Sequence, residues 1–243
     1  MDIATYAAEA EVEQTHWWFV VRRELFLREI VRLGIAKNAA ILDVGTSTGT
    51  NLRMLTDAGF TNVTGSDLSD ESVRWCAEKG LPPVVKGDAC ALPFEAGRFD
   101  LVLATDIIEH VDDDRAAVVE FLRVLRPDGH VLITVPTFKS LWGLQDLLAH
   151  HKRRYRMTQL LEVIRSSGLE PQRHYYFNFL LFVPIWLGRQ ILVRLRPDIR
   201  SEAEVNTPIL NSILKGVFRL DTLLAPVLRA PVGVSALVVA KKI

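Results

Sequence analysis

The chain has 243 residues, of which 49% are hydrophobic and 24% are charged, and its 29 basic side chains equal its 29 acidic ones. This composition excludes an intrinsically disordered chain, and two cysteines are too few for a disulfide-stabilised scaffold. The charge is divided unevenly, because residues 150–243 contain 15 lysines and arginines against 6 acids, whereas residues 1–149 contain 14 against 23. We expect a basic face directed at an anionic or membrane-associated partner.

The sequence predicts neither a secretory signal nor a membrane-spanning helix. The N-terminal MDIATYAAEAEVEQ lacks the basic and apolar regions of a secretory signal. The apolar stretch at 175–188 contains Pro184 and is shorter than the roughly 20 residues that a spanning helix needs. We expect a cytoplasmic protein, and peripheral contact with the inner face of a membrane stays open as an alternative.

Apolar residues with helical spacing predict a first helix over residues 16–33, which Gly34 ends. Short runs rich in Val, Ile and Leu then alternate with helical segments. The expected strands are residues 39–44, 62–66, 83–86, 99–105 and 130–135, and the expected helices are residues 49–58, 69–79 and 113–125. An RPDG turn at 126–129 should end the last of these helices. Such alternation predicts a parallel, doubly wound α/β sheet.

After this core in the chain, we expect a helix over residues 158–167, a strand over 169–177 and a closing strand over 231–242. An insertion of about fifty residues separates the last two strands. Apolar residues recur in it at helical spacing, and we expect this stripe to dock on the protein itself. The stripe consists of Ile209, Leu210, Ile213, Leu214, Val217, Phe218, Leu220 and Leu224.

The segment ILDVGTSTG at 41–49 places Asp43 at the end of a strand and a glycine turn before a helix. In open α/β sheets, ligands bind beyond the carboxyl ends of the strands. A dinucleotide loop would require G-x-G-x-x-G, but Ser47 and Thr50 stand at the second and third glycine positions, which argues against a Rossmann-type oxidoreductase. No Lys-Ser/Thr pair follows, which excludes a P-loop. A nucleoside with a cationic amino-acid end suits Asp43 better.

Two further acids end the next two predicted strands. Asp67 stands where a carboxylate accepts both ribose hydroxyls. Asp88 stands where its side chain can accept from the adenine amino group while Ala89 supplies a backbone N–H. Each acid alone is also an ordinary turn or N-cap residue. Their recurrence at three successive strand ends favours one pocket.

These motifs resemble those of the class I S-adenosylmethionine-dependent methyltransferases. The resemblance runs through ILDVGTSTG, VTGSDLS, GDACALPF, RFDLVLATDIIEHV and LRVLRPDGHVLITVP. It implies a Rossmann-like seven-stranded sheet of order 3-2-1-4-5-7-6 with an antiparallel last strand, and S-adenosyl-L-methionine as cofactor. Where the family usually has glycine, Ser47 must take a glycine-like conformation or the loop must shift. The implied cofactor-binding residues are Arg22, Asp43, Gly45, Thr46, Gly49, Asp67, Leu68, Asp88, Ala89 and Thr105.

Candidate catalytic bases follow the fourth strand and precede the penultimate one. His151 is the first candidate, with Asp146 to orient it, and His110 is the second. The sequence Asp106–His110 also resembles the E-x-x-E-H motif of a few magnesium-dependent methyltransferases, with His151 as the distal ligand. Since E-H is common here in methyltransferases without a metal, we expect no metal.

In a related bacterial group, a similar H-W-W-F…R helix precedes the core and H-K-R-R-Y precedes the penultimate strand. This chain matches both, at 16–22 and 151–155. Trp17 and Trp18 would then cover the crevice, and Arg22 would pair with the cofactor carboxylate. The structural alternative is that the tryptophans pack between helices and that the arginine faces solvent. The expected substrate-binding residues are Trp17, Trp18, Arg153, Arg154 and Tyr155.

Basic residues form two groups. One is expected beside the mouth of the active site, namely Lys152, Arg153, Arg154 and Arg156, and the other follows the apolar 175–188 stretch, namely Arg189, Arg194, Arg196 and Arg200. Aliphatic neighbours favour a membrane surface over nucleic acid. We expect transfer of a methyl group, most simply to oxygen, on a small, lipid-linked or quinone-like acceptor. A non-catalytic cofactor-binding partner subunit is the alternative.

The expected organisation is a single domain, with a helical lid at 1–36, a cofactor core at 37–136, an acceptor-side segment at 137–177, a helical insertion at 178–230 and a last strand at 231–243.

Overall fold

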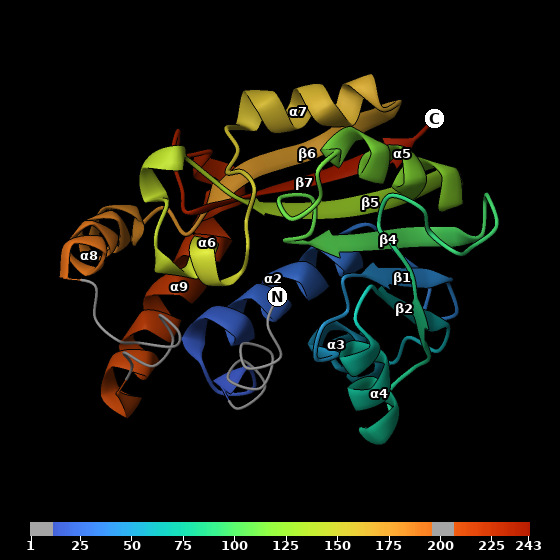
Figure 1. The fold of residues 1–243 in the computed structure, drawn as a ribbon, viewed down its shortest axis with the longest axis horizontal. Coiled ribbons are helices and arrows are strands. Elements are labelled where there is room, and N and C mark those ends of the chain that lie inside the picture. Colours follow the sequence, from blue (N-terminus) through green and yellow to red (C-terminus); the bar gives the residue numbers. More distant parts are fainter. Residues whose placement is uncertain (1–11, 196–206) are drawn as a thin grey trace.

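A seven-stranded mixed sheet forms the centre of the computed structural model, which describes residues 12–195 and 207–243 (Figure 1). The strand order β3-β2-β1-β4-β5-β7-β6 confirms the expected topology, and only β7 runs antiparallel to its neighbours. The strands are β1 (Ile41–Val44), β2 (Val63–Asp67), β3 (Val84–Lys86), β4 (Phe99–Thr105), β5 (Leu125–Pro136), β6 (Leu169–Phe177) and β7 (Ser235–Lys242).

Alternating side chains along the buried strands build two cores, one on each face of the sheet. In β5, Val131, Ile133 and Val135 point to one face, and Leu132 points to the other. Helices α5 (Asp114–Val124) and α7 (Met157–Ser166) cover the first face. Helices α2 (Trp17–Arg32), α3 (Thr50–Asp57), α4 (Asp70–Glu78) and α9 (Pro208–Leu228) lie on the second (Figure 1).

The element boundaries follow the sequence pattern closely, with one local error. Strands β4 and β6 match their predicted ranges, and β7 begins at Ser235 rather than 231. The RPDG segment was expected to be a turn, but it extends β5 toward its amino end, and Leu125 pairs with Phe99. A register shift between Phe99 and Leu101 absorbs the turn-forming residues, and Asp128 takes a φ of 64° there.

The insertion forms helices α8 (Phe182–Leu195) and α9 at one edge of the molecule, at the left in Figure 1. The expected docking of its stripe is correct for Phe218, which is fully buried, and wrong for Ile209, Leu210, Ile213 and Leu220, which are exposed. No helix in the described ranges is long and apolar enough to cross a membrane. The side chains of 191–195, including Arg194, and all of 196–206, including Arg196 and Arg200, lie outside the description.

Two short elements follow β5 at the carboxyl edge of the sheet. They are a 3₁₀ turn, η1 (Lys139–Leu141), and helix α6 (Leu144–Leu148). Their loop is closed at its base, where the backbone N–H of Phe138 donates to the carbonyl of Tyr155 and the N–H of Tyr155 donates to the carbonyl of Pro136. Farther along, the backbone N–H of Lys152 donates to the carbonyl of Glu109, which fixes this loop against the one that follows β4. The loop is thereby held over the strand ends.

Candidate active site

A cavity of about 630 Å³ lies at the carboxyl ends of the strands. Its walls come from α2, from the loops after β1, β2, β3 and β4, and from the loop that carries α6. Ile185 and Gly188 of α8 and Leu214 of α9 complete it. The cavity therefore stands where an open α/β sheet binds its ligand, and the insertion forms its far wall.

The glycine turn after β1 forms one end of this cavity. Gly45 has a φ of 73°, and a Cβ atom there would overlap Ile107, so that only glycine fits. Ser47 has a φ of 52°, which confirms that it takes a conformation usually left to glycine. Its N–H donates to Asp67 over 2.8 Å, and its carbonyl accepts from the Ser72 hydroxyl over 2.6 Å. These bonds offset the cost of the left-handed backbone, about 1–3 kcal/mol.

Asp43 lies fully buried beneath the turn. Its Oδ1 accepts a hydrogen bond from Asn51 over 3.0 Å, whereas its Oδ2 has no partner among the described atoms. Burial raises the pKa of Asp43 to about 7, and the nearby Asp67 adds to the rise. A buried carboxyl group with an unsatisfied oxygen suits a cationic ligand group such as an ammonium.

Asp67 and Asp88 occupy the next two strand ends and line the same cavity. The Asp67 carboxylate already accepts backbone hydrogen bonds from Ser47 and Ser69, at 2.8 and 2.9 Å, which fixes its orientation. The Asp88 carboxylate accepts from the backbone N–H of Cys90 over 2.8 Å. Both side chains are thus held in place by the chain before any ligand binds.

Most of the residues that the sequence assigned to the cofactor meet in this cavity. A glycine cradle, an unsatisfied buried acid and two oriented carboxylates fit S-adenosyl-L-methionine, the cofactor that the sequence resemblance implies. Asp43 and Gly49 lie beneath the wall rather than in it. The predicted residues in the wall are Arg22, Gly45, Thr46, Asp67, Leu68, Asp88, Ala89 and Thr105.

Helix α2 covers the cavity with its first turns. The Trp18 ring stacks on Phe218 of α9 with 5.3 Å between centroids and 8° between planes, and Trp17 meets the same ring edge-on. Both tryptophans also line the cavity, so that the same side chains pack on α9 and cover the cavity. Arg22, expected to pair with a cofactor carboxylate, forms an ion pair of 2.6 Å with Asp106 instead, and its Nε has no partner among the described atoms.

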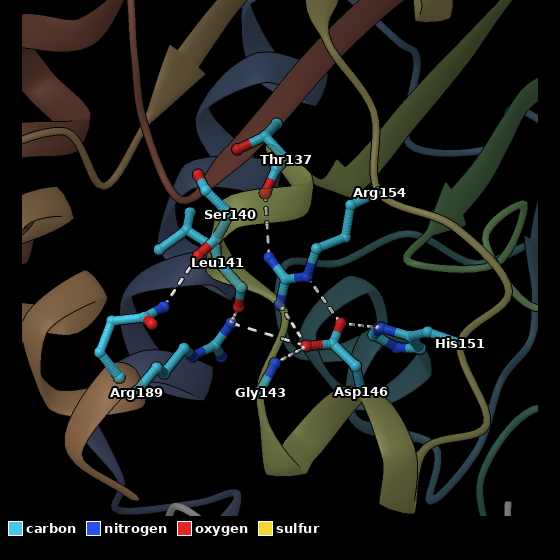
Figure 2. Close-up of polar contacts among 9 residues, drawn as sticks. Thr137, Ser140, Leu141, Gly143, Asp146, His151, Arg154 and Arg189 are labelled. Carbon is cyan, nitrogen blue, oxygen red and sulfur yellow. Dashed lines mark hydrogen bonds and ion pairs between the residues drawn. The ribbon is translucent and has the colours of Figure 1, made fainter. Parts of the chain in front are cut away.

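A buried carboxylate organises the opposite wall, as Figure 2 shows. Asp146 accepts from Arg154 through two bonds of 2.7 and 2.9 Å, from the backbone N–H of Gly143 over 2.7 Å and from His151 Nδ1 over 2.8 Å. Burial favours a raised pKa for Asp146, but the hydrogen bonds from His151 and Arg154 outweigh it and hold this pKa well below the usual range. An ionised Asp146 makes Nδ1 the protonated nitrogen of His151, which leaves Nε2 as a proton acceptor.

Two titratable residues stand beside His151. Burial, strengthened by the neighbouring His151, lowers the pKa of His110 to about 4, and the two rings meet edge to face at 4.7 Å. Burial, together with Asp106, raises the pKa of Glu109 well above its usual value. Glu109, His110 and His151 hold possible metal-ligand atoms within 4.8 Å of one another. In the absence of a cation, the raised pKa of Glu109 and the lowered pKa of His110 favour the neutral form of each side chain.

Two expected substrate-binding residues do not line the cavity. Arg153 donates to the carbonyls of Val111 and Asp112 and pairs with Asp114 over 2.9 Å. Tyr155 is buried and donates to Asp114 over 2.7 Å. Both side chains fasten the loop to the start of α5, because Asp114 offers a half-buried acceptor there. Of the H-K-R-R-Y segment, His151 and Arg154 face the cavity.

Several wall residues were missed by reasoning from the sequence. Glu13 lines the cavity. Its backbone carbonyl accepts from the Arg23 guanidinium over 2.8 Å, and its carboxylate accepts from the Thr48 hydroxyl. Arg189 of α8 donates to the Leu141 carbonyl over 2.7 Å and lies 3.9 Å from Asp146 (Figure 2). No local motif marks these residues, because they reach the cavity from segments far from the glycine turn.

Comparison with known proteins also indicates a methyltransferase. Residues 42–133 match the family model described as "Methyltransferase domain". The chain is 27% identical over 179 residues to an O-methyltransferase, rstn1, of Aspergillus nomiae, covering 61% of this chain and 79% of the relative. It is 32% identical over 146 residues to a demethylmenaquinone methyltransferase of Renibacterium salmoninarum, covering 59% of each.

Among solved structures, a methyltransferase of Thermotoga maritima described as SAM-dependent has the same fold. It superimposes with a TM-score of 0.64 at 17% identity, covering 99% of this chain and 96% of that chain. Residues 42–133 thus form a methyltransferase domain, and the strand order and the cavity built around the glycine turn agree with a class I S-adenosylmethionine-dependent methyltransferase.

Proposed function

We propose that the enzyme methylates a hydroxyl group of a hydrophobic acceptor, quinone-like or lipid-linked. The observation that carries this proposal is the composition of one cavity, in which the cofactor acids, His151 and the apolar wall of Ile185 and Leu214 all take part. The two relatives described above are an O-methyltransferase and a demethylmenaquinone methyltransferase, which is consistent with this acceptor class.

His151 is the proposed general base. When bound, S-adenosyl-L-methionine supplies an electrophilic methyl group, so that the protein has to align the acceptor and remove its proton. The free Nε2 of His151 accepts the hydroxyl proton, and the Asp146 carboxylate stabilises the resulting imidazolium from the other side of the ring. A base of this kind contributes roughly 10²–10⁴-fold to the rate.

Arg154 and Asp146 act as positioning residues for this base. The two-bond contact between them fixes the carboxylate plane, and Arg154 is anchored in turn by donating to the Thr137 carbonyl over 3.0 Å. Alignment of this kind contributes on the order of 7–11 kcal/mol to a two-reactant step. His110 lies beside His151, and its lowered pKa keeps a second positive charge away from the imidazolium.

We further propose that the first part of the chain, up to residue 36, acts as a lid over the cofactor. We also propose that the enzyme works as a peripheral protein at the inner face of a membrane. The basic character of residues 150–243 and the apolar wall of the cavity support this placement. A hydrophobic acceptor would then reach His151 from the lipid phase.

Substitution of His151 tests the catalytic part. His151→Asn should lower kcat for a quinol or polyprenyl-linked hydroxyl acceptor by roughly 10²–10⁴-fold and leave the affinity for S-adenosylhomocysteine unchanged, as measured by calorimetry. His174→Asn, at an exposed position of β6, is the matched control and should retain wild-type rates. An unaltered kcat in His151→Asn would remove the histidine from the mechanism.

A further inference from the structure

Helix α9 carries apolar residues on two opposite sides. Its buried side, with Phe218, Thr222 and Ala225, packs toward α2 and β6. A second row follows spacings of 4, 7, 3 and 4 residues, which place all its members on one stripe of an α-helix. This outer stripe consists of Ile209, Ile213, Leu220, Leu223 and Val227, whose exposed fractions range from 53% to 80%.

Helix α8 adds a second exposed apolar face at the same edge of the molecule (Figure 1). Val183, Trp186 and Leu187 follow i, i+3, i+4 spacing and are 59%, 37% and 50% exposed. The other side of α8 contributes Ile185 and Gly188 to the cavity wall. The exposed faces of the two helices are called the α8–α9 apolar surface below.

Charge indicates what covers this surface. Along α8 and α9 the sequence places Arg189, Arg194, Lys215 and Arg219 against a single acid, Asp221. Of these cations, Arg189 faces Asp146 on the cavity side and Arg219 pairs with Glu24 of α2. Asp221 is buried, where it accepts the backbone N–H groups of Asn178 and Leu180 at 2.6 and 2.8 Å. A large apolar surface bordered by cations fits an anionic lipid bilayer, into which side chains insert while basic groups meet the head groups.

We infer that the α8–α9 apolar surface is the membrane-docking face of this enzyme. The inference rests on the proposed function and makes it specific. Because Ile185 and Leu214 belong to the docking helices and also line the cavity, docking would bring the acceptor side of the cavity to the lipid surface. Since α9 also packs on α2 through Phe218, the cofactor would stay on the side of the protein remote from the bilayer.

Vesicle sedimentation of the full chain tests this inference. We expect binding to vesicles of phosphatidylglycerol and phosphatidylcholine in equal parts, weaker binding to phosphatidylcholine alone, and a decrease as salt rises. Ile213→Glu and Leu223→Glu should each lower the partition coefficient at least about tenfold. Val31→Glu and Val119→Glu, at exposed apolar positions of α2 and α5, are matched controls and should bind as the wild type does.

A depth measurement adds a second criterion. Vesicles with brominated acyl chains should quench the Trp186 fluorescence, and Trp186→Phe should abolish the quenchable component. Absence of vesicle binding by the wild type, or equal binding by Leu223→Glu, would overturn the inference. A dimer in light scattering that Leu223→Glu dissociates would make a second copy of the chain the occupant and would equally overturn it. Because no acceptor is needed here, failure of the proposed methyl transfer would be recognised separately.

Discussion

At the scale of single residues, Asp43 joins stability to cofactor binding. Its carboxyl group holds a proton up to about pH 7 in the folded protein, whereas the unfolded chain releases that proton near the ordinary value of 3.8. The folded state therefore binds more protons between these two values. The contribution of Asp43 to stability falls as the pH rises through this window and stays constant above it.

Asp43→Asn should separate the two roles of this residue. We expect the variant to gain stability over the wild type as the pH rises from 4 to 7, at about 1.4 kcal/mol or less per pH unit, with a constant difference above pH 7. Its affinity for S-adenosylhomocysteine should fall, because the amide cannot neutralise the ammonium group. Urea unfolding at several pH values and calorimetry measure the two effects, and a pH-independent stability difference would contradict the assignment.

The cluster of Glu109, His110 and His151 yields a separate prediction about metals. Burial favours the neutral forms of Glu109 and His110, while Asp146 keeps the Nδ1 side of His151 occupied. The expectation from the sequence is that this cluster works without a metal. We expect kcat to be unchanged after treatment with EDTA and removal of the chelator. A loss of activity that Mg²⁺, Mn²⁺ or Zn²⁺ restores would show instead that the cluster holds a metal.

At the scale of elements, the stack of Trp18 on Phe218 links α2 to α9 across the cavity rim. The Trp17 backbone N–H donates to the Asn211 side chain over 2.7 Å, and Arg219 pairs with Glu24. Three kinds of contact therefore hold the helical insertion against the first helix. This connection explains why the H-W-W-F segment lies beside residues nearly two hundred positions later.

Phe218→Ala should destabilise the protein by about 3–5 kcal/mol, because it removes a fully buried ring and the stacking partner of Trp18. Leu220→Ala, two residues along the same helix and 53% exposed, should change the unfolding free energy by less than about 0.5 kcal/mol. Denaturant titration compares the two variants. Equal effects would mean that α9 does not pack on α2 in this orientation.

The sequence predicted most of the sheet and much of the cofactor side of the cavity, because both follow from local patterns. Short apolar runs define the strands, and the acids at their ends follow from topology. Helix α9 shows where this reasoning fails, since its spacing predicts a helix but does not tell which apolar side is buried. Arg153 and Tyr155 show the same limit. Their proximity to His151 in the chain says nothing of Asp114, the partner that holds Tyr155 from 41 residues away and Arg153 from 39.

At the scale of the whole molecule, the balanced charge of the chain resolves into two regions. Asp67 and Asp88 line the cofactor end of the cavity and Asp43 lies beneath it, whereas basic and exposed apolar residues accompany the acceptor end and the insertion. Cofactor and acceptor would thus approach the reacting centre from different sides. Such an arrangement suits an enzyme whose cofactor comes from water and whose acceptor comes from lipid.

The most direct test of this account is to identify the methylated product in a membrane extract of the source cells. The extract would be incubated with methyl-labelled S-adenosylmethionine and the purified protein, with the His151→Asn variant in parallel. The account predicts label in the organic phase of a chloroform–methanol partition, as a methyl ether, for the wild type alone. Label confined to water-soluble metabolites, protein or nucleic acid would contradict it.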